Sequence, residues 1–297
     1  MCIRPVLFDL DGKVATRRQI LTHLGRMGAA GVAGAGLSLA PPPPAGYPVL
    51  WALDGMASFP MIAIERRRTP TAQDAGLLRQ REQHAPDGLV VGIGYASGEP
   101  FDLHARALDY TPAGEGATGD LLSPRHGGSA AFTRFLIEEL RPLIGSAWPL
   151  DPAGHTLFGF SYGGLFTVQL LCRAPQHFQR WWAASPSLWF RGHTALEPWG
   201  GAGAEQAPDF RRHPVSVQLT VGEGEQHPPG NVSAARREQL QARRMVDNLR
   251  DLHALLERQP GVAARLLVLP GRDHMDMLAH GARAVFSFAF DDRRPLS

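Results

Sequence analysis

The sequence predicts an α/β domain whose central sheet is mostly parallel and carries helices on both faces. Short apolar runs alternate with longer helical patterns from residue 49 to residue 290, as in repeated strand–helix units. The length of 297 residues suits one such domain, and 44% hydrophobic residues are enough to fill its core. Each predicted strand is short and leads into Gly, Asp, Pro or Ser, which are residues that favour loops.

Six segments have the composition of buried strands: 49–53, 89–95, 156–160, 180–184, 216–221 and 264–269. Four segments have helical periodicity: 128–143, 163–174, 234–259 and 275–290. The helix at 234–259 combines an apolar stripe with a charged face that we expect to be solvated. The irregular stretch 191–210 is expected to be an insertion over the sheet, where lids lie.

Residues 1–40 are expected to form an atypical N-terminus, and residues 41–297 the catalytic domain. The stretch TRRQILTHLGRMGAAGVAGAGLSLA (16–40) has the pattern of a twin-arginine export signal, with Arg17 and Arg18 ahead of a weakly apolar Gly/Ala segment. We therefore expect the twin-arginine machinery to export the protein to the periplasm. The alternative is an amphipathic surface helix, in which case the protein stays in the cytoplasm.

The composition argues against two other classes of protein. The formal net charge is only +2, and no Lys/Arg cluster alternates with aromatic residues as a nucleic-acid-binding surface requires. The signal-like segment is too polar and too rich in glycine to span a membrane. We expect a small-molecule substrate, with no cofactor and no metal site.

A candidate nucleophile lies in the stretch TLFGFSYGGLF (156–166), where Ser161 stands in a Gly-x-Ser-x-Gly pattern. An apolar strand precedes this serine and a helical segment follows it, as the strained strand-to-helix turn of a nucleophile elbow requires. Gly159 and Gly163 leave room for the turn, and Gly164 lets the helix approach the sheet. The pattern predicts Ser161 as a catalytic nucleophile.

A nucleophilic serine needs a base and a carboxylate that orients the base, in the chain order Ser, Asp/Glu, His. In ARLLVLPGRDHMDML a strand and a glycine turn lead to His274, which we predict as the base, with His227 and His280 as alternatives. In VQLTVGEGEQ a strand leads to Glu225, which we predict as the acid. Two alternatives remain for the acid: Glu223 in its place, or a serine–histidine dyad that has no acid close to the base.

An oxyanion hole requires two backbone N–H donors. Tyr162 follows the nucleophile and is predicted to supply one of them. The loop after the strand in PVLWALDGMASF is predicted to supply the other, from Gly55 or Met56.

Several stretches between residues 46 and 280 resemble the esterase-D-like α/β-hydrolases, in particular the periplasmic siderophore trilactone esterases. In order these are GYPVLWALDGMASF, LDYTP, FTRFLIEELRPLI, LFGFSYGGLF, ASPSLWF, VGEGEQ, RMVDN and PGRDHMDML. The resemblance implies the α/β-hydrolase fold and carries the family's nucleophile onto Ser161 and its histidine onto His274. Its hole-forming loop falls on Gly55 and Met56. Some relatives act through a serine–histidine dyad.

The resemblance also implies where substrate binds. The DYTP stretch with Arg106, and Trp189 in SPSLWF, border the substrate cleft in such enzymes. An iron-bound catecholate trilactone is a trianion, so arginines beside aromatic surface would suit it. We predict Arg106, Arg125 and Trp189 as substrate-binding residues.

The chain departs from the family before GYPVL, where relatives build their first strands. Either the reading frame is shortened, or residues 1–40 form an atypical edge of the sheet. Together the features predict a serine esterase that cleaves the ester or lactone bonds of a catecholate siderophore. The alternatives are a general carboxylesterase for another acyl ester and an inactive, truncated member.

Overall fold

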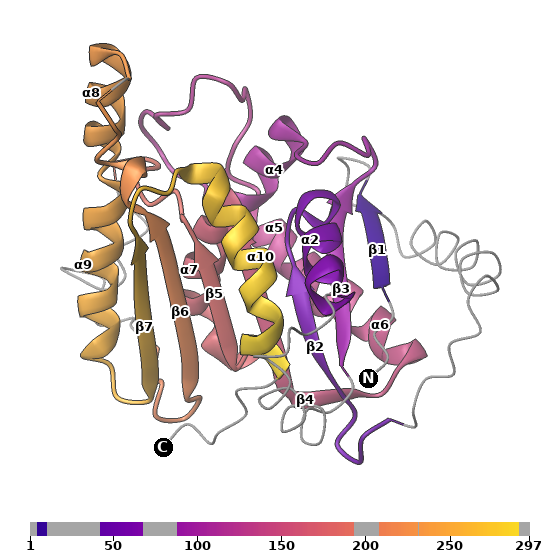
Figure 1. Ribbon diagram of the computed structural model, residues 1–297. Coiled ribbons are helices and arrows are strands. Elements are labelled where there is room, and N and C mark those ends of the chain that lie inside the picture. The colour runs from indigo at the N-terminus through magenta and orange to yellow at the C-terminus, as the bar shows by residue number, and fades with distance from the viewer. Residues whose placement is uncertain (1–4, 11–41, 68–87, 193–207, 231, 291–297) are drawn as a thin grey trace.

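The strands of the protein form one sheet in which every neighbouring pair is parallel. The computed structural model describes residues 5–10, 42–67, 88–192, 208–230 and 232–290. In this part of the chain the sheet has seven strands in the order β1-β3-β2-β4-β5-β6-β7 (Figure 1). The bounds are β1 Pro5–Leu10, β2 Tyr47–Ala52, β3 Leu89–Tyr95, β4 Leu150–Phe160, β5 Arg180–Ala184, β6 Val215–Gly222 and β7 Val262–Leu269.

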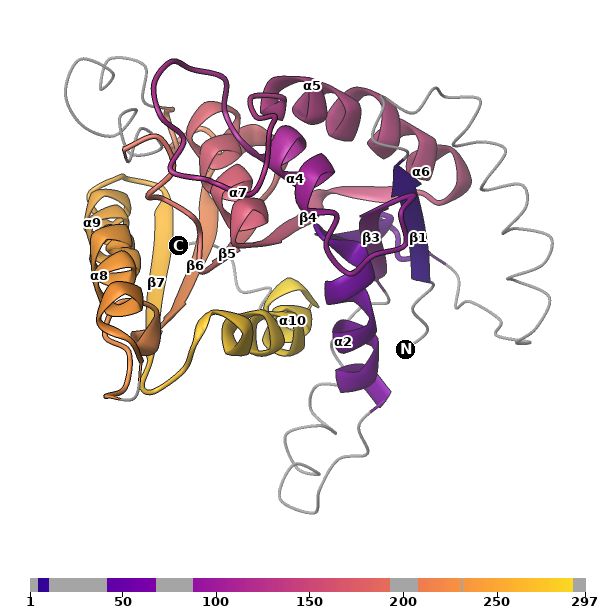
Figure 2. The same cartoon turned by 90° about the horizontal axis from the view of Figure 1, so that it is seen from above.

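Helices cover both faces of this sheet, as Figure 2 shows from above. Helices α2 (Gly55–Arg67) and α10 (His274–Phe290) lie together on one face. The other face carries α4 (Leu103–Tyr110), α5 (Ser129–Arg134), α6 (Arg141–Ala147), α7 (Tyr162–Arg173) and α9 (Met245–Glu257), and α8 (Ala234–Arg243) extends past the ends of the strands, above α9 in Figure 1. A π-helical turn, Phe135–Leu140, joins α5 to α6, and two 3-10 turns lie at Pro175–His177 and Glu223–Glu225.

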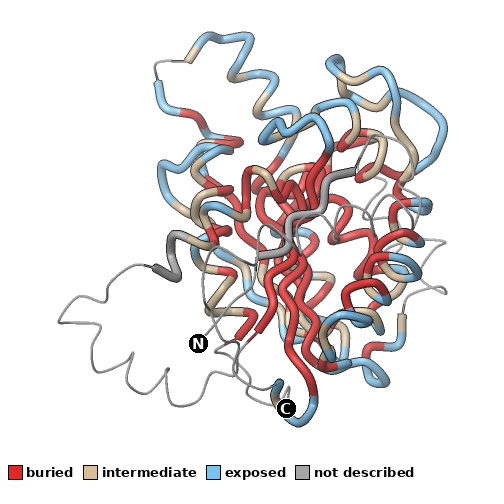
Figure 3. Tube along the Cα trace, turned by 90° about the vertical axis from the view of Figure 1, so that its right-hand side faces the viewer, coloured by how far each residue is buried: buried red, intermediate tan, exposed pale blue. Residues whose placement is uncertain are grey.

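The sheet divides the core into two layers. In β2, Val49 and Trp51 pack toward α5, α6 and α7, whereas Leu50 and Ala52 pack toward α2 and α10. This alternation is what a strand buried on both faces requires, because successive side chains point to opposite sides. Figure 3 shows the result, a buried sheet enclosed by helices whose outer surfaces are exposed.

All six strands expected from the sequence are present, and the α/β class with its parallel sheet is confirmed. The structure adds β1, which pairs with β3 at the edge of the sheet, so part of the 1–40 segment does form a sheet edge. It also adds α2 and α4. Helix α2 contains Pro60 and has no acidic residue in its first turn, so it lacks the usual sequence signals of a helix.

The helix expected over 234–259 is wrong as a single element, because the chain breaks between α8 and α9. Arg244 has a φ of 49° and a ψ of 39°, which is the left-handed conformation and ends α8. Immediately after the break, Gln226 Oε1 accepts the N–H groups of Val246 and Asp247, at 2.9 and 3.0 Å. The side chain of Gln226 therefore caps α9 from a distant part of the sequence.

Two expectations fall outside the described residues. The export-signal stretch 16–40 lies outside them, and so does most of the insertion expected at 191–210. Among the described helices, none is both long and apolar enough to cross a membrane.

Candidate active site

Ser161 lies on the sharp turn between β4 and α7. Its φ of 58° and ψ of −114° are strained for a residue with a side chain, as expected of a nucleophile elbow. A Cβ on Gly159 would lie 2.1 Å from the carbonyl oxygen of Gly163, so position 159 accepts no side chain. A Cβ on Gly164 would lie 3.0 Å from the carbonyl oxygen of Ala184, which shows how closely α7 approaches β5. Gly163 is less crowded, with its nearest contact at 3.4 Å.

The structure brings His274 and Glu225 to this serine. His274 is the first residue of α10, and its Nε2 lies 3.0 Å from Ser161 Oγ. Its Nδ1 lies 2.5 Å from Glu225 Oε2. The other carboxylate oxygen of Glu225 accepts hydrogen bonds from Ser185 Oγ at 2.5 Å and from the N–H of Gly222 at 2.8 Å. The three side chains thus form a continuous hydrogen-bonded series with the geometry of a serine–histidine–acid triad.

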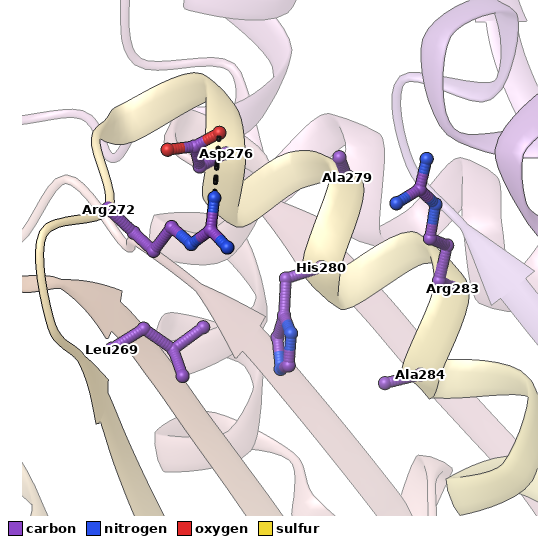
Figure 4. A pocket seen from close by; sticks show the side chains of 7 residues that line it. All are labelled: Leu269, Arg272, Asp276, Ala279, His280, Arg283 and Ala284. Atoms are coloured by element: carbon purple, nitrogen blue, oxygen red, sulfur yellow. Dashed lines mark ion pairs between the residues drawn. The ribbon is translucent and has the colours of Figure 1, made fainter.

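The alternative residues lie elsewhere. Glu223 is exposed, and its Oε2 accepts the N–H of Gly271 at 3.2 Å. His227 is also exposed. His280 projects from α10 into a separate cavity of about 300 Å³, which Arg272, Asp276 and Arg283 also line (Figure 4). This cavity contains none of the three residues of the hydrogen-bonded series.

The proposed oxyanion donors stand at the N-termini of two neighbouring helices. Because β2 pairs with β4, helix α2 begins beside helix α7. The N–H groups of Gly55, Met56 and Tyr162 find no hydrogen-bond acceptor among the described residues, as expected for the first turn of a helix. Unpaired donors at two adjacent helix N-termini form a suitable site for a developing negative charge.

A cleft of about 460 Å³ opens over Ser161 and His274. Its walls include Trp189 and two arginines of α8, Arg236 and Arg243. The Arg243 guanidinium lies 4.4 Å from the centre of the Trp189 ring, within the range of a cation–π contact. Apolar side chains from the same helix and from the start of α10, Leu240 and Met275, complete this part of the cleft. The cleft can therefore take an anionic ligand with aromatic character.

The structure places two of the predicted substrate-binding residues away from this cleft. Arg106 is buried and does not line the cleft; its guanidinium donates to both carboxylate oxygens of Asp54, each at 2.9 Å. Arg125 is exposed and is also absent from the cleft wall. Trp189 is the one of the three predicted residues that lines the cleft.

Arg236 and Arg243 line the cleft but are not among the residues predicted from the sequence. Both belong to the RREQLQARRM stretch, which reads as the solvated face of one long helix. The break at Arg244 separates α8 from α9 and leaves α8 beside the cleft, with none of its residues buried. The density of arginines in this short stretch is the sequence signal that would have drawn attention to a positively charged surface.

Comparisons with known proteins show which proteins this chain resembles. The family model named Esterase matches residues 38–254. The ferri-bacillibactin esterase of Bacillus subtilis (strain 168) is 32% identical over 246 residues, which are 80% of this chain and 77% of that protein. The apo-salmochelin esterase of Escherichia coli O6:H1 is 37% identical over 158 residues, 52% of this chain and 45% of that protein. The solved structure of the siderophore hydrolase EstB from Aspergillus nidulans superposes with a TM-score of 0.67 and 25% identity, covering 84% and 85% of the two chains.

Proposed function

The chain belongs to the Esterase family, and on that premise we propose that it is a serine esterase acting on a siderophore with anionic aromatic groups. The hydrogen-bonded series Ser161–His274–Glu225 at the floor of the cleft is the observation that carries this proposal. Two relatives that match this chain are named for ester hydrolysis of siderophores. Residues 41–297 are proposed as the catalytic domain.

In the proposed mechanism, Ser161 Oγ attacks the ester carbonyl carbon while His274 Nε2 accepts the hydroxyl proton. Glu225 orients the imidazole and stabilises its protonated form. The oxyanion accepts hydrogen bonds from the N–H of Tyr162 and from Gly55 or Met56. The C–O bond then breaks, and His274 returns its proton to the departing alcohol. Water, deprotonated by His274, attacks the acyl-enzyme and releases the acid and the free serine.

The cleft wall supports the proposed class of substrate. Trp189 offers aromatic surface, and Arg236 and Arg243 offer positive charge beside it. A catecholate siderophore combines anionic oxygens with aromatic rings, so it complements both features. A volume of about 460 Å³ lies within the range of sites that bind small molecules, so the cleft would hold the scissile arm of a larger ligand.

A general carboxylesterase is the second candidate. The apolar part of the cleft, with Leu240 and Met275, would also accept a simple acyl chain. The two functions differ in their preferred substrate. The test compares kcat/KM of the purified full chain for a catecholate trilactone, with and without iron, and for p-nitrophenyl butyrate. The siderophore proposal expects the trilactone to be preferred by at least about tenfold. Equal or better hydrolysis of the aryl ester would favour the general carboxylesterase.

We also propose that residues 16–40 direct export through the twin-arginine machinery. The proposal rests on the sequence pattern alone. It is tested by replacing Arg17 and Arg18 with lysine and measuring esterase activity in periplasmic and cytoplasmic fractions. Export by this route predicts that the periplasmic activity is lost from the double variant. Unchanged distribution would contradict it.

A further inference from the structure

A buried ion pair joins two segments that flank the active site. Arg106 Nε donates to Asp54 Oδ1 and Arg106 Nη2 to Asp54 Oδ2, both at 2.9 Å. The two side chains are 7% and 1% exposed, so this bidentate pair is withdrawn from solvent. Burial by itself would lower the pKa of Arg106, but the Asp54 carboxylate outweighs it and the pKa lies above its ordinary value. Removing a charged pair from water is costly, so its position calls for an explanation.

Asp54 is held at the entrance to the proposed oxyanion loop. It directly precedes Gly55 and has a φ of 49°, an uncommon conformation for a residue other than glycine. Both polar backbone groups of Asp54 are hydrogen-bonded. Its N–H donates to Tyr110 Oη at 3.3 Å, and its carbonyl oxygen accepts the N–H groups of Ala57 and Ser58. The next two N–H groups, those of Gly55 and Met56, find no acceptor among the described residues.

The same guanidinium contacts the nucleophile elbow. Arg106 Nη2 also donates to the carbonyl oxygen of Phe160, at 3.2 Å, and Phe160 directly precedes Ser161. The Arg106 Cζ atom lies 5.5 Å from the centre of the Tyr162 ring. One side chain from α4 therefore contacts both segments that carry the unpaired N–H groups, although no backbone hydrogen bond joins residues 54–56 to residues 160–162.

We propose that Arg106 is a positioning residue that fixes the spacing between the two halves of the oxyanion hole. It acts through Asp54 on Gly55 and Met56, and through Phe160 on Tyr162. This inference rests on the proposed serine esterase function. Donors must lie about 2.7–3.1 Å from the oxyanion to be effective, so a small shift of one helix relative to the other weakens them. Loss of Arg106 should therefore lower kcat rather than substrate affinity.

Arg141 provides a control for a merely structural role. It is a half-buried arginine that donates to a carbonyl oxygen, that of His177, at 2.8 Å, and its guanidinium lies 4.7 Å from the centre of the Phe178 ring. None of these groups belongs to the active-site cleft. Arg141→Met should therefore lower the melting temperature without a matching loss of kcat.

The test measures kcat, KM and melting temperature of the full chain with p-nitrophenyl butyrate for five variants: Arg106→Lys, Arg106→Met, Asp54→Asn, Asp54→Asn/Arg106→Met and Arg141→Met. We expect kcat to fall about 10²-fold in Arg106→Met and Asp54→Asn, with KM within about twofold of the wild type. Arg106→Lys should be intermediate. The kcat of the double variant should be little lower than that of either single variant, because each substitution breaks the same Arg106–Asp54 interaction. If Arg106→Met does not fold, Arg106→Lys and Asp54→Asn decide the question.

A second readout is the rate at which a fluorophosphonate labels Ser161, which depends on the same donors and should fall in parallel with kcat. The proposal is overturned if KM rises while kcat stays constant, if the two single effects multiply, or if Arg141→Met loses as much kcat at equal melting temperature. A wild-type chain that hydrolyses no ester would instead refute the proposed function. An active wild type with an equally active Arg106→Lys would refute only the positioning role.

Discussion

Glu225 is buried, and its two carboxylate oxygens accept hydrogen bonds from Ser185, from the N–H of Gly222 and from the ring of His274. Glu223, two residues earlier, is exposed, and in the part of the chain that the structure describes its carboxylate accepts only the N–H of Gly271. A carboxylate held by several donors is fixed in place, which is what orienting an imidazole requires. The geometry therefore distinguishes between two carboxylates that the sequence left as alternatives.

Glu225→Gln should lower kcat with p-nitrophenyl butyrate by about 10²–10⁴-fold, because an amide cannot hold the same imidazole tautomer or stabilise its protonated form. Glu223→Gln is the matched control and should change kcat by less than about threefold, since its carboxylate is exposed and carries one surface contact. Steady-state kinetics on both variants check this. Equal losses in the two variants, or none in Glu225→Gln, would point to a dyad.

At the scale of elements, the break between α8 and α9 shapes the substrate cleft. A continuous helix would carry Arg236 and Arg243 on a solvated face, as the periodicity of the sequence indicates. The left-handed Arg244 and the cap from Gln226 end that helix and leave α8 as a wall of the cleft. Gln226 follows Glu225 directly, so the segment that supplies the proposed acid also fixes the start of α9.

Arg243→Ala should raise KM for an anionic catecholate ester by about tenfold, because it removes both a charge and a contact with the Trp189 ring. KM for the uncharged p-nitrophenyl butyrate should change little. Arg250→Ala is the control, since Arg250 lies on α9, is 58% exposed and, within the described ranges, has its ion pair with Asp247 at 3.6 Å. Equal effects of the two variants would exclude a local role of Arg243. High salt should reproduce part of the Arg243→Ala effect in the wild type.

The sequence predicted an element best where an apolar run and the residues of the following turn are consecutive. The strand, the serine and the glycines of 156–164 are consecutive in sequence, so the elbow could be recognised without tertiary information. The pairing of Arg106 with Asp54 could not, because 52 residues separate them and only packing shows that Arg106 is buried. The α8–α9 break depends in the same way on Gln226, 20 residues before Val246.

At the scale of the whole molecule, the order of strands assembles the site. Ser161, Glu225 and His274 follow β4, β6 and β7, and all pairs between these strands are parallel. Their carboxyl ends therefore meet at one edge of the sheet, where groups that lie 113 residues apart in sequence come within 3.0 Å. The parallel sheet could be predicted from the alternation of strands and helices, whereas β1 at its edge required the structure.

The stability of the whole fold should depend on Asp109. Burial raises the pKa of this carboxyl to about 6, and its Oδ2 accepts the Tyr95 hydroxyl at 3.1 Å. Because the folded state holds this proton more tightly than the unfolded state, stability falls as the pH rises from about 4 to about 6 and is then constant. Asp109→Asn keeps an acceptor for Tyr95 and removes the charge.

We therefore expect Asp109→Asn to raise the free energy of unfolding at pH 7.5 by about 1–3 kcal/mol and to change it little at pH 4. Urea unfolding of both proteins at the two pH values checks the sign. A variant less stable than the wild type at pH 7.5 would mean that the ionised carboxylate stabilises the fold. An equal gain at both pH values would assign the effect to packing.

The role of Ser161 as the nucleophile is tested by the initial rate of trilactone hydrolysis by Ser161→Ala beside the wild type, both as the full chain with matched melting temperatures. Alanine removes only the oxygen that attacks the carbonyl, and Ser187 Oγ, 3.4 Å from Ser161 Oγ, cannot replace it in the same geometry. We expect a loss of at least about 10⁴-fold in kcat. Hydrolysis by Ser161→Ala at the wild-type rate would contradict it.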